Sequence, residues 1–276
     1  EIAKRGVRKK AAIANLNLME DKIRQVHENG FETCQICCWN GAWMTDEAAD
    51  RIRALCETYH VEISTFWCGW SGPGVWDFAE GPLTLGLVPP EYRFARMEEL
   101  KRGSDFAKRL GTENIATHVG FLPEVSGSGE YRAVVAALKH VANYVKANGQ
   151  YFLFETGQET PVTLLRTIED IGTDNLGINL DPANLILYGK ANPVDALDVF
   201  GKYVRDVHAK DGLYPTDGKH LGRETPLGEG KVDFPRLIAK LREVGYDGSL
   251  TIEREISGEQ QLKDILRGKA LLEELI

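Results

Sequence analysis

The sequence predicts a single (β/α)8 barrel, a closed ring of eight parallel strands with helices on its outside. Three observations favour this fold class. Short apolar runs alternate with helical patterns along all 276 residues, and no linker, low-complexity tract or close repeat divides the chain. The length is close to the roughly 250 residues of such barrels. Several runs end in polar side chains, as expected where parallel strands meet one face. We therefore expect one domain spanning residues 1–276.

The first half of the chain supplies four strands and four helices. The expected strands are Ala11–Asn15, Thr33–Cys38, Val61–Trp67 and Asn114–His118. The expected helices are Leu18–Asn29, Thr45–Tyr59, Tyr92–Leu110 and Tyr131–Ala147. Thr45 is a good helix N-cap, and Asn148 with Gly149 forms a good stop signal. A Gly/Pro-rich connection over Gly69–Pro90 precedes the third helix, and we expect it to form a lid or an oligomer contact.

The second half repeats the alternation. The expected strands are Tyr151–Glu155, Leu176–Asp181, Val204–His208 and Ser249–Glu253. Pro161 opens the helix that follows the first of these strands, at the favoured first-turn position. The last three helices are expected over Pro193–Phe200, Phe234–Val244 and Glu259–Leu275. Eight strand-then-helix units in one chain imply that the sheet closes into a barrel.

The composition is that of a soluble globular protein. Hydrophobic residues make up 43% and charged residues 27%, which is enough for a full core and gives no sign of disorder. A net charge of −8 disfavours a nucleic-acid partner, because phosphate binding needs a basic face. The N-terminus lacks the apolar stretch of a signal peptide, and no run is long enough to cross a membrane, so we expect a cytoplasmic protein without a membrane partner. The five cysteines lack the spacing of a zinc site and are expected to be reduced, mostly buried thiols.

Four side chains that bind metals stand at the ends of the predicted strands of the second half: Glu155, Asp181, His208 and Glu253. Their local strings are YFLFE, LGINLD, YVRDVH and SLTIE, each followed by turn residues. Because the carboxyl ends of parallel strands meet at one face of a barrel, these side chains are expected to lie together. Three carboxylates with one imidazole form an oxygen-rich set that suits a divalent metal such as Mn2+.

The same half carries a family resemblance. The strings FETGQE, NLDPAN, DVHAKD, PLGEGKVDF and GYDGSLTIERE resemble the xylose isomerase-like TIM-barrel superfamily, which groups ketose epimerases, sugar isomerases, inosose dehydratases and endonuclease IV. In the epimerase branch a Glu, an Asp, a His and a second Glu bind one divalent metal, and the two glutamates also act as acid and base. The resemblance implies these roles for Glu155, Asp181, His208 and Glu253, with Mn2+ or in its place Co2+, Mg2+ or Zn2+.

The implied reaction moves a hydrogen next to a sugar ketone. Removing that proton leaves an enediolate, and a divalent cation stabilises its negative oxygen by several kcal/mol. One glutamate removes the proton, and the other returns one on the opposite face. We therefore expect a metal-dependent sugar epimerase or isomerase with a keto-sugar or sugar derivative as substrate. Relatives are often dimers or tetramers, so the resemblance also implies a homo-oligomer, and a small partner subunit that completes the pocket stays open.

Three polar residues near the strand ends are further candidates for substrate contacts. His118 ends the fourth strand in the run IATHVG, where it contacts substrate or metal-bound water, acts as general base, or is structural. Asn184 stands where several relatives carry a histidine, and its amide can still hold a hydroxyl. Lys210 follows His208 by two positions, so it can contact a substrate oxygen or pair with a nearby acid.

Tryptophans gather around the second and third strand ends and the long connection after them: Trp39, Trp67, Trp70 and Trp76. Trp39 and Trp67 are candidate substrate contacts, because aromatic faces suit the apolar side of a sugar ring or an aglycone. Packing of a lid onto the barrel is the alternative. Because this loop could accept an aglycone, a lyase is the alternative function. In a lyase the enediolate intermediate expels a group from the β-carbon. Dehydration of an inosose, or cleavage of a 3-keto-glycoside as in a C-glycoside deglycosidase, would follow.

Two further classes of protein with this fold are an endonuclease IV-like nuclease and a non-catalytic scaffold. An endonuclease IV-like nuclease needs more histidines for a three-metal cluster, and this chain has six in all. Three of them, His27, His60 and His140, fall on predicted helices, which disfavours this class. A non-catalytic scaffold has no reason to retain the four-ligand set, and titration with metal would separate it from an enzyme.

Overall fold

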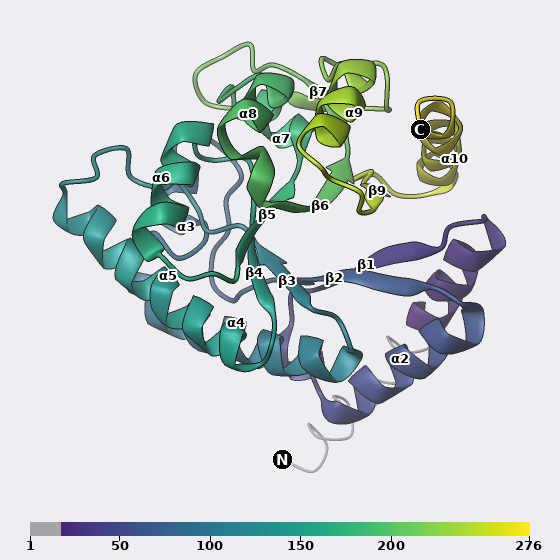
Figure 1. The fold of residues 1–276 in the computed structure, drawn as a ribbon, viewed down its shortest axis with the longest axis horizontal. Helices are drawn as coiled ribbons and strands as arrows, with labels where there is room; N and C mark the ends of the chain where they lie inside the picture. Colours follow the sequence, from purple (N-terminus) through teal and green to yellow (C-terminus); the bar gives the residue numbers. More distant parts are fainter. Residues whose placement is uncertain (1–17) are drawn as a thin grey trace.

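The computed structural model describes residues 18–276, and its main sheet contains seven strands. They are β1 (Thr33–Cys38), β2 (Glu62–Cys68), β3 (Asn114–Thr117), β4 (Tyr151–Glu155), β5 (Leu176–Leu180), β6 (Val204–Ala209) and β9 (Leu250–Ile252). All neighbouring strands are parallel, and their order in space is the order in the chain. The outer strands β1 and β9 also approach each other, so the sheet curls into a nearly closed barrel (Figure 1). The predicted barrel class is confirmed, and the strand predicted at Ala11–Asn15 lies outside the described residues.

Helices follow the strands and cover the outside of the sheet (Figure 1). Residues 18–28 are helical. The longer helices after them are α2 (Asp46–Tyr59), α4 (Pro90–Leu110), α5 (Gly129–Ala147), α6 (Pro161–Ile171), α8 (Pro193–Phe200), α9 (Phe234–Glu243) and α10 (Glu259–Glu273). Thr45 caps α2 as predicted, since its side chain accepts a hydrogen bond from the backbone N–H of Ala48. None of the helices within residues 18–276 has the length and apolar character needed to span a membrane.

Several short elements were not predicted from the sequence. They are η1 (Gly41–Trp43), α3 (Gly81–Thr84), α7 (Pro182–Leu187), η2 (Gly201–Tyr203), β7 (Asp211–Leu213) and β8 (Arg223–Thr225). β7 and β8 form a separate antiparallel ribbon. Strands this short show no hydrophobic alternation. The ribbon depends instead on the buried carboxylate of Asp211, which accepts backbone N–H groups of Gly228, Gly230 and Val232.

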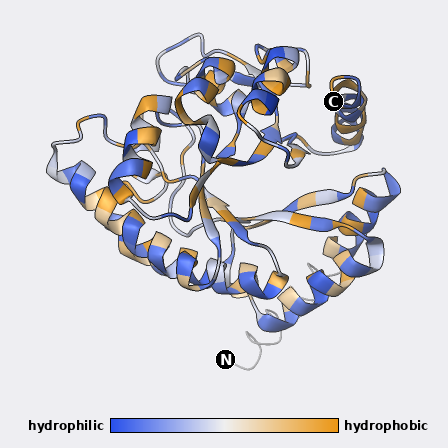
Figure 2. Cartoon of the chain, in the orientation of Figure 1, coloured by the Kyte–Doolittle hydropathy of each residue, from blue (hydrophilic) through white to orange (hydrophobic). Residues whose placement is uncertain are grey.

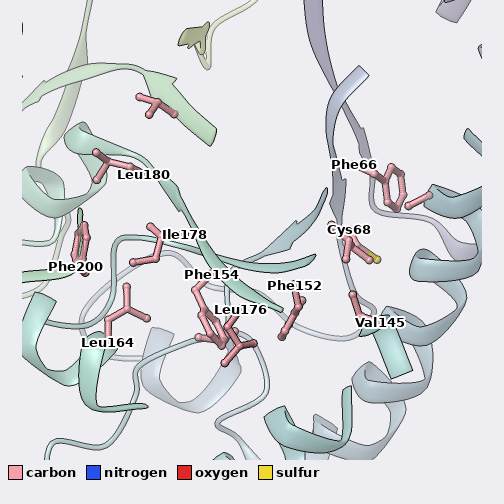
Figure 3. Packing of buried hydrophobic residues seen from close by; sticks show 14 of the residues in the cluster. Phe66, Cys68, Val145, Phe152, Phe154, Leu164, Leu176, Ile178, Leu180 and Phe200 are labelled. Carbon is pink, nitrogen blue, oxygen red and sulfur yellow. The ribbon is translucent and has the colours of Figure 1, made fainter. Parts of the chain in front are cut away.

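The sheet separates an apolar core from a more polar barrel interior. Figure 2 shows hydrophobic colour along the central strands and both kinds of colour on the helices. Phe152 and Phe154 of β4 belong to the large core that includes helix residues, and Figure 3 shows them among their neighbours. Leu153 instead packs inside the barrel with Ala116 and Trp67. Because side chains alternate along a strand, Glu155 shares the inward direction of Leu153 and stands at the carboxyl end of the barrel interior.

Candidate active site at the carboxyl ends of the strands

Four strands bring the predicted metal ligands to one place. Glu155 ends β4, Asp181 follows β5, His208 lies in β6 and Glu253 follows β9. One ligand atom of each residue lies within 4.8 Å of all the others. Glu155, Asp181 and His208 are buried, and Glu253 is partly exposed. The structure therefore brings together the set that the strand ends predict, and among the described residues this is the one such group.

The imidazole of His208 directs Nδ1 at all three carboxylates. Nδ1 is 3.2 Å from Glu253 Oε2, 3.4 Å from Glu155 Oε1 and 3.6 Å from Asp181 Oδ2. Burial opposes a positive charge on the ring, but the charges of Glu155 and Glu253 outweigh it and raise the pKa of His208 well above its ordinary value. Nδ1 is thus the nitrogen that faces the cluster.

The other ring nitrogen of His208 is held by Gln35 of β1. Gln35 Oε1 lies 2.8 Å from His208 Nε2, and Asn179 Nδ2 lies 3.1 Å from the same nitrogen. A carbonyl oxygen only accepts, so the shorter contact, with Gln35, assigns the hydrogen to Nε2. The amide nitrogen of Gln35 donates to Asn179 Oδ1 at 3.3 Å. Sequence reasoning missed Gln35. The available signal was one long polar side chain inside the otherwise apolar strand TCQICC.

Asp181 offers one free oxygen to the cluster. Its Oδ1 accepts the backbone N–H of Asn184 at 2.8 Å and caps α7. Its Oδ2 is buried and has no hydrogen-bond partner, and the same holds for His208 Nδ1. Buried polar atoms normally have hydrogen-bond partners. Two metal-ligating atoms without such partners, facing each other, are what a site for a metal ion would show.

Lys210 supplies positive charge to the cluster. Its buried Nζ is 3.0 Å from Glu253 Oε2 and 3.7 Å from Asp181 Oδ2. Burial alone would raise the pKa of Glu253, but Lys210 and His208 reverse the effect and lower it to about 2. With His208 neutral, as a metal ligand must be, the three ionised carboxylates and the Lys210 ammonium leave two negative charges, which a divalent cation would neutralise. Together with the orphaned atoms and the oxygen-rich donor set, this charge shows that the residues fit a divalent metal.

The carboxylate of Glu155 is held by three of the predicted substrate contacts. Trp67 Nε1 donates to Oε2, and Asn184 Nδ2 donates to Oε1 at 3.3 Å. His118 Nε2 lies 3.3 Å from Oε1. Burial opposes the charge on His118, but the charge of Glu155 outweighs it and raises the pKa of His118. These contacts fix the orientation of the Glu155 carboxylate.

All five predicted substrate contacts line one pocket with a volume of about 480 Å3. They are His118, Asn184, Lys210, Trp39 and Trp67. Glu155, His208 and Glu253 form its acidic side. Two larger hollows lie near the opposite ends of the strands, away from this cluster. The pocket therefore joins the ligand set to the predicted contacts in a single cavity of a size that suits a small ligand.

Glu159, in the loop after β4, is a buried acid that sequence reasoning did not single out. Both of its carboxylate oxygens are without a hydrogen-bond partner. Burial raises the pKa of Glu159 to about 7, although nearby backbone N–H groups and the charges of His118 and Lys190 act against the rise. The string FETGQE contains both Glu155 and Glu159. Only Glu155 stands at the end of the predicted strand, so the sequence identified it and not Glu159.

The fold and the site together define a parallel-barrel protein of the kind that carries its chemistry at the carboxyl ends of the strands. The family described as xylose isomerase-like TIM barrel matches residues 23–275. The chain therefore belongs to the xylose isomerase-like TIM-barrel family, and the resemblance seen in the sequence is confirmed.

Several relatives carry the names of isomerases or dehydratases. A solved structure, the xylose isomerase domain protein from Planctomyces limnophilus, is 39% identical, with a TM-score of 0.87 and 90% coverage of both chains. The putative hydroxypyruvate isomerase of Homo sapiens is 26% identical over 86% of this chain and 84% of its own. The inosose dehydratase of Lacticaseibacillus casei is 23% identical over 46% of this chain and 47% of its own.

Solved structures of lower identity show the fold alone. They include a D-tagatose 3-epimerase-like protein, a probable 3-DHS dehydratase from Bacillus anthracis and a barrel protein from Mycobacterium smegmatis in complex with magnesium. Epimerases and dehydratases therefore share this fold.

Proposed function

We propose that the protein is a divalent-metal-dependent epimerase or isomerase of a keto-sugar, acting through an enediolate next to the ketone. The observation that carries the proposal is the cluster of Glu155, Asp181, His208 and Glu253, whose ligand atoms lie within 4.8 Å of one another. It stands in a pocket of about 480 Å3 at the face where barrel enzymes carry out their chemistry. The relative named as a putative hydroxypyruvate isomerase supports the reaction class.

The four clustered residues would hold the metal, and we propose Mn2+, with Mg2+, Co2+ or Zn2+ in its place. When bound, a divalent cation supplies the positive charge that stabilises an enediolate by several kcal/mol. His208 would contribute Nδ1, because Gln35 occupies Nε2. Asp181 would contribute Oδ2, because the helix cap uses Oδ1.

Glu155 and Glu253 are the proposed acid and base. They stand on strands separated by β5 and β6, so they approach the pocket from different sides. One carboxylate removes the proton next to the ketone, and the other delivers a proton to the opposite face of the carbon. Lys210 keeps Glu253 ionised, and Trp67, Asn184 and His118 fix the direction of Glu155.

A metal-dependent lyase is the second candidate. It begins with the same proton removal, and the electron pair then expels a hydroxyl or an alkoxy group from the β-carbon instead of accepting a proton. The tryptophan side of the pocket favours this candidate, because it offers apolar surface to a leaving group. The inosose dehydratase among the relatives supports it over part of the chain. A nuclease is not proposed, since the described residues contain one ligand cluster and the chain is acidic.

Hydrogen exchange into the substrate tests the proposal. The Mn2+-loaded protein is incubated in D2O with ketohexoses, inososes and 3-keto-glucosides, and proton NMR follows each carbon. We expect deuterium next to the ketone and a loss of at least about 100-fold in rate for Glu155→Gln and Glu253→Gln. The control Glu169→Gln removes an exposed acid of α6 and should leave the rate unchanged.

The products separate the candidates. Epimer formation with deuterium supports the epimerase, and release of water or aglycone supports the lyase. Mn2+ binding is measured on the same samples by electron paramagnetic resonance. A wild-type protein that binds no divalent metal contradicts both candidates, because the four-residue cluster is then not a metal site.

A further inference from the structure

One side of the pocket is a wall of tryptophans, which reaches Glu155 through Trp67. Trp39 is central, with ring centroids 4.9 Å from Trp67 and 5.3 Å from Trp70. Trp76 lies 6.3 Å from Trp39 and 5.2 Å from His118. Trp67 and Trp70 are buried, whereas Trp39 and Trp76 are 46% and 40% exposed and line the pocket. Two buried rings thus support two rings whose surfaces face the cavity.

Arg96 of α4 fixes the loop that carries this wall. Its side chain is fully buried, and its guanidinium lies 4.0 Å from the centroid of the Trp70 ring. It donates hydrogen bonds to four backbone carbonyl oxygens of the loop, those of Ser71, Pro73, Thr84 and Gly86. A buried guanidinium with four hydrogen bonds holds these segments in one arrangement. The Trp76 surface is therefore formed before any ligand arrives.

Gly69 lets Trp39 lie flat against the backbone. A Cβ atom added at Gly69 would stand 2.6 Å from Cδ2 of the Trp39 ring, which is too close for any side chain. The glycine thereby places the indole at the mouth of the pocket. Both exposed rings are consequently held by features that leave their outer surfaces free.

We propose that Trp39 and Trp76 form a second subsite, which binds a flat apolar group attached to the keto-sugar. The inference rests on the proposed function, because the sugar ketone itself is placed at Glu155 and Glu253. The pocket of about 480 Å3 lies in the size range of ligands larger than a monosaccharide, so a sugar held at the acidic side leaves the exposed indoles free for a substituent. An aromatic substituent offers faces and edges that pair with indole rings. The substrate class is therefore an aryl-substituted keto-sugar.

Binding of two matched probes tests the subsite apart from catalysis. Dissociation constants of phenyl and methyl 3-keto-β-D-glucopyranoside are measured by calorimetry on the Mn2+-loaded protein. We expect the phenyl compound to bind about tenfold more tightly, since stacking on two rings adds to the buried area. Trp76→Ala and Trp39→Ala should each bring the two constants to within about threefold of each other. Trp43→Ala removes a tryptophan that is 42% exposed but lies outside the pocket, and should leave the preference intact.

The outcomes of the two proposals are distinguishable. Equal affinity of the two probes in the wild type overturns the subsite, and so does a phenyl preference that survives in both tryptophan variants. A change of oligomeric state in Trp76→Ala without any phenyl preference in the wild type would assign the wall to a second copy of the chain instead. Hydrogen exchange with the methyl probe tests only the reaction. A phenyl preference without exchange supports the subsite and contradicts the epimerase.

Discussion

The two sides of the pocket are built in different ways. On the acidic side, each of Glu155, Asp181, His208 and Glu253 comes from the end of a different strand. On the aromatic side, the exposed ring of Trp76 comes from one loop that follows β2. The barrel itself therefore places the acids, and strand alternation fixes their direction. Placement of Trp76 depends instead on contacts within the loop.

This difference separates the reaction from the choice of substrate. A loop held by one buried side chain can change without moving strand ends, and barrel enzymes vary in this way. Arg96 and the four-residue cluster do not touch each other in the described structure. A substitution on the aromatic side should therefore change substrate binding, and one on the acidic side should change metal binding and the reaction.

The largest effect is expected for Arg96→Met, which breaks the aromatic side. The variant leaves four buried carbonyl oxygens without their donor, and we expect about 4 kcal/mol less stability in urea unfolding. Mn2+ affinity of the folded variant should change by less than about threefold, because the cluster stands on the strands. Arg102→Met, at an exposed position of the same helix, serves as the control and should cost less than about 0.5 kcal/mol. A clear loss of Mn2+ affinity in Arg96→Met, together with its loss of stability, would show that the two sides of the pocket are not independent.

A second prediction concerns Glu159, which lies behind the pocket near His118. Its pKa rises from 4.5 to about 7 on folding, because burial disfavours the charge more than His118 and Lys190 favour it. Below pH 4.5 the acid is protonated in both states and costs nothing. Between pH 4.5 and 7 the folded state binds the extra proton, so stability falls as pH rises, and the full cost is present above pH 7.

Glu159→Gln removes this cost. We expect a gain of about 3 kcal/mol at pH 8 and almost none at pH 4, measured by urea unfolding at both pH values. Glu169→Gln, at an exposed position, should show no gain at either pH. A gain of the same size at pH 4 and pH 8 would mean that the carboxyl charge is not its cause.

The sequence predicted the acidic side much better than the aromatic side. Glu155 and His208 are recognisable because each lies at the end of a short apolar run, where the direction of a strand leaves few alternatives. Arg96 is not recognisable in the helix PEYRFARMEELKR, where it resembles any surface cation. Its burial depends on the path of a loop that starts more than twenty residues earlier, which periodicity does not report.

Gln35 was missed for a related reason. Its partner His208 is 173 positions away and four strands separate β1 from β6 in the sheet, so only curling of the sheet into a barrel brings the two side chains together. A local pattern contains no information about such a contact. The ribbon of β7 and β8 was missed because three-residue strands carry no periodic signal.

The smallest effect is expected for Gln35→Leu, which tests how the acidic side of the pocket holds His208. The variant keeps the size of the side chain but removes the oxygen that accepts the Nε2–H of His208, so the imidazole loses its fixed tautomer. Outer partners of metal ligands typically contribute 10- to 100-fold in affinity, and we expect Mn2+ to bind about 10-fold more weakly. Gln35→Glu retains an acceptor and should bind Mn2+ at least as tightly as the wild type. Nitrogen NMR of the imidazole reports the tautomer directly, and an unchanged tautomer with unchanged affinity in Gln35→Leu would contradict the role assigned to Gln35.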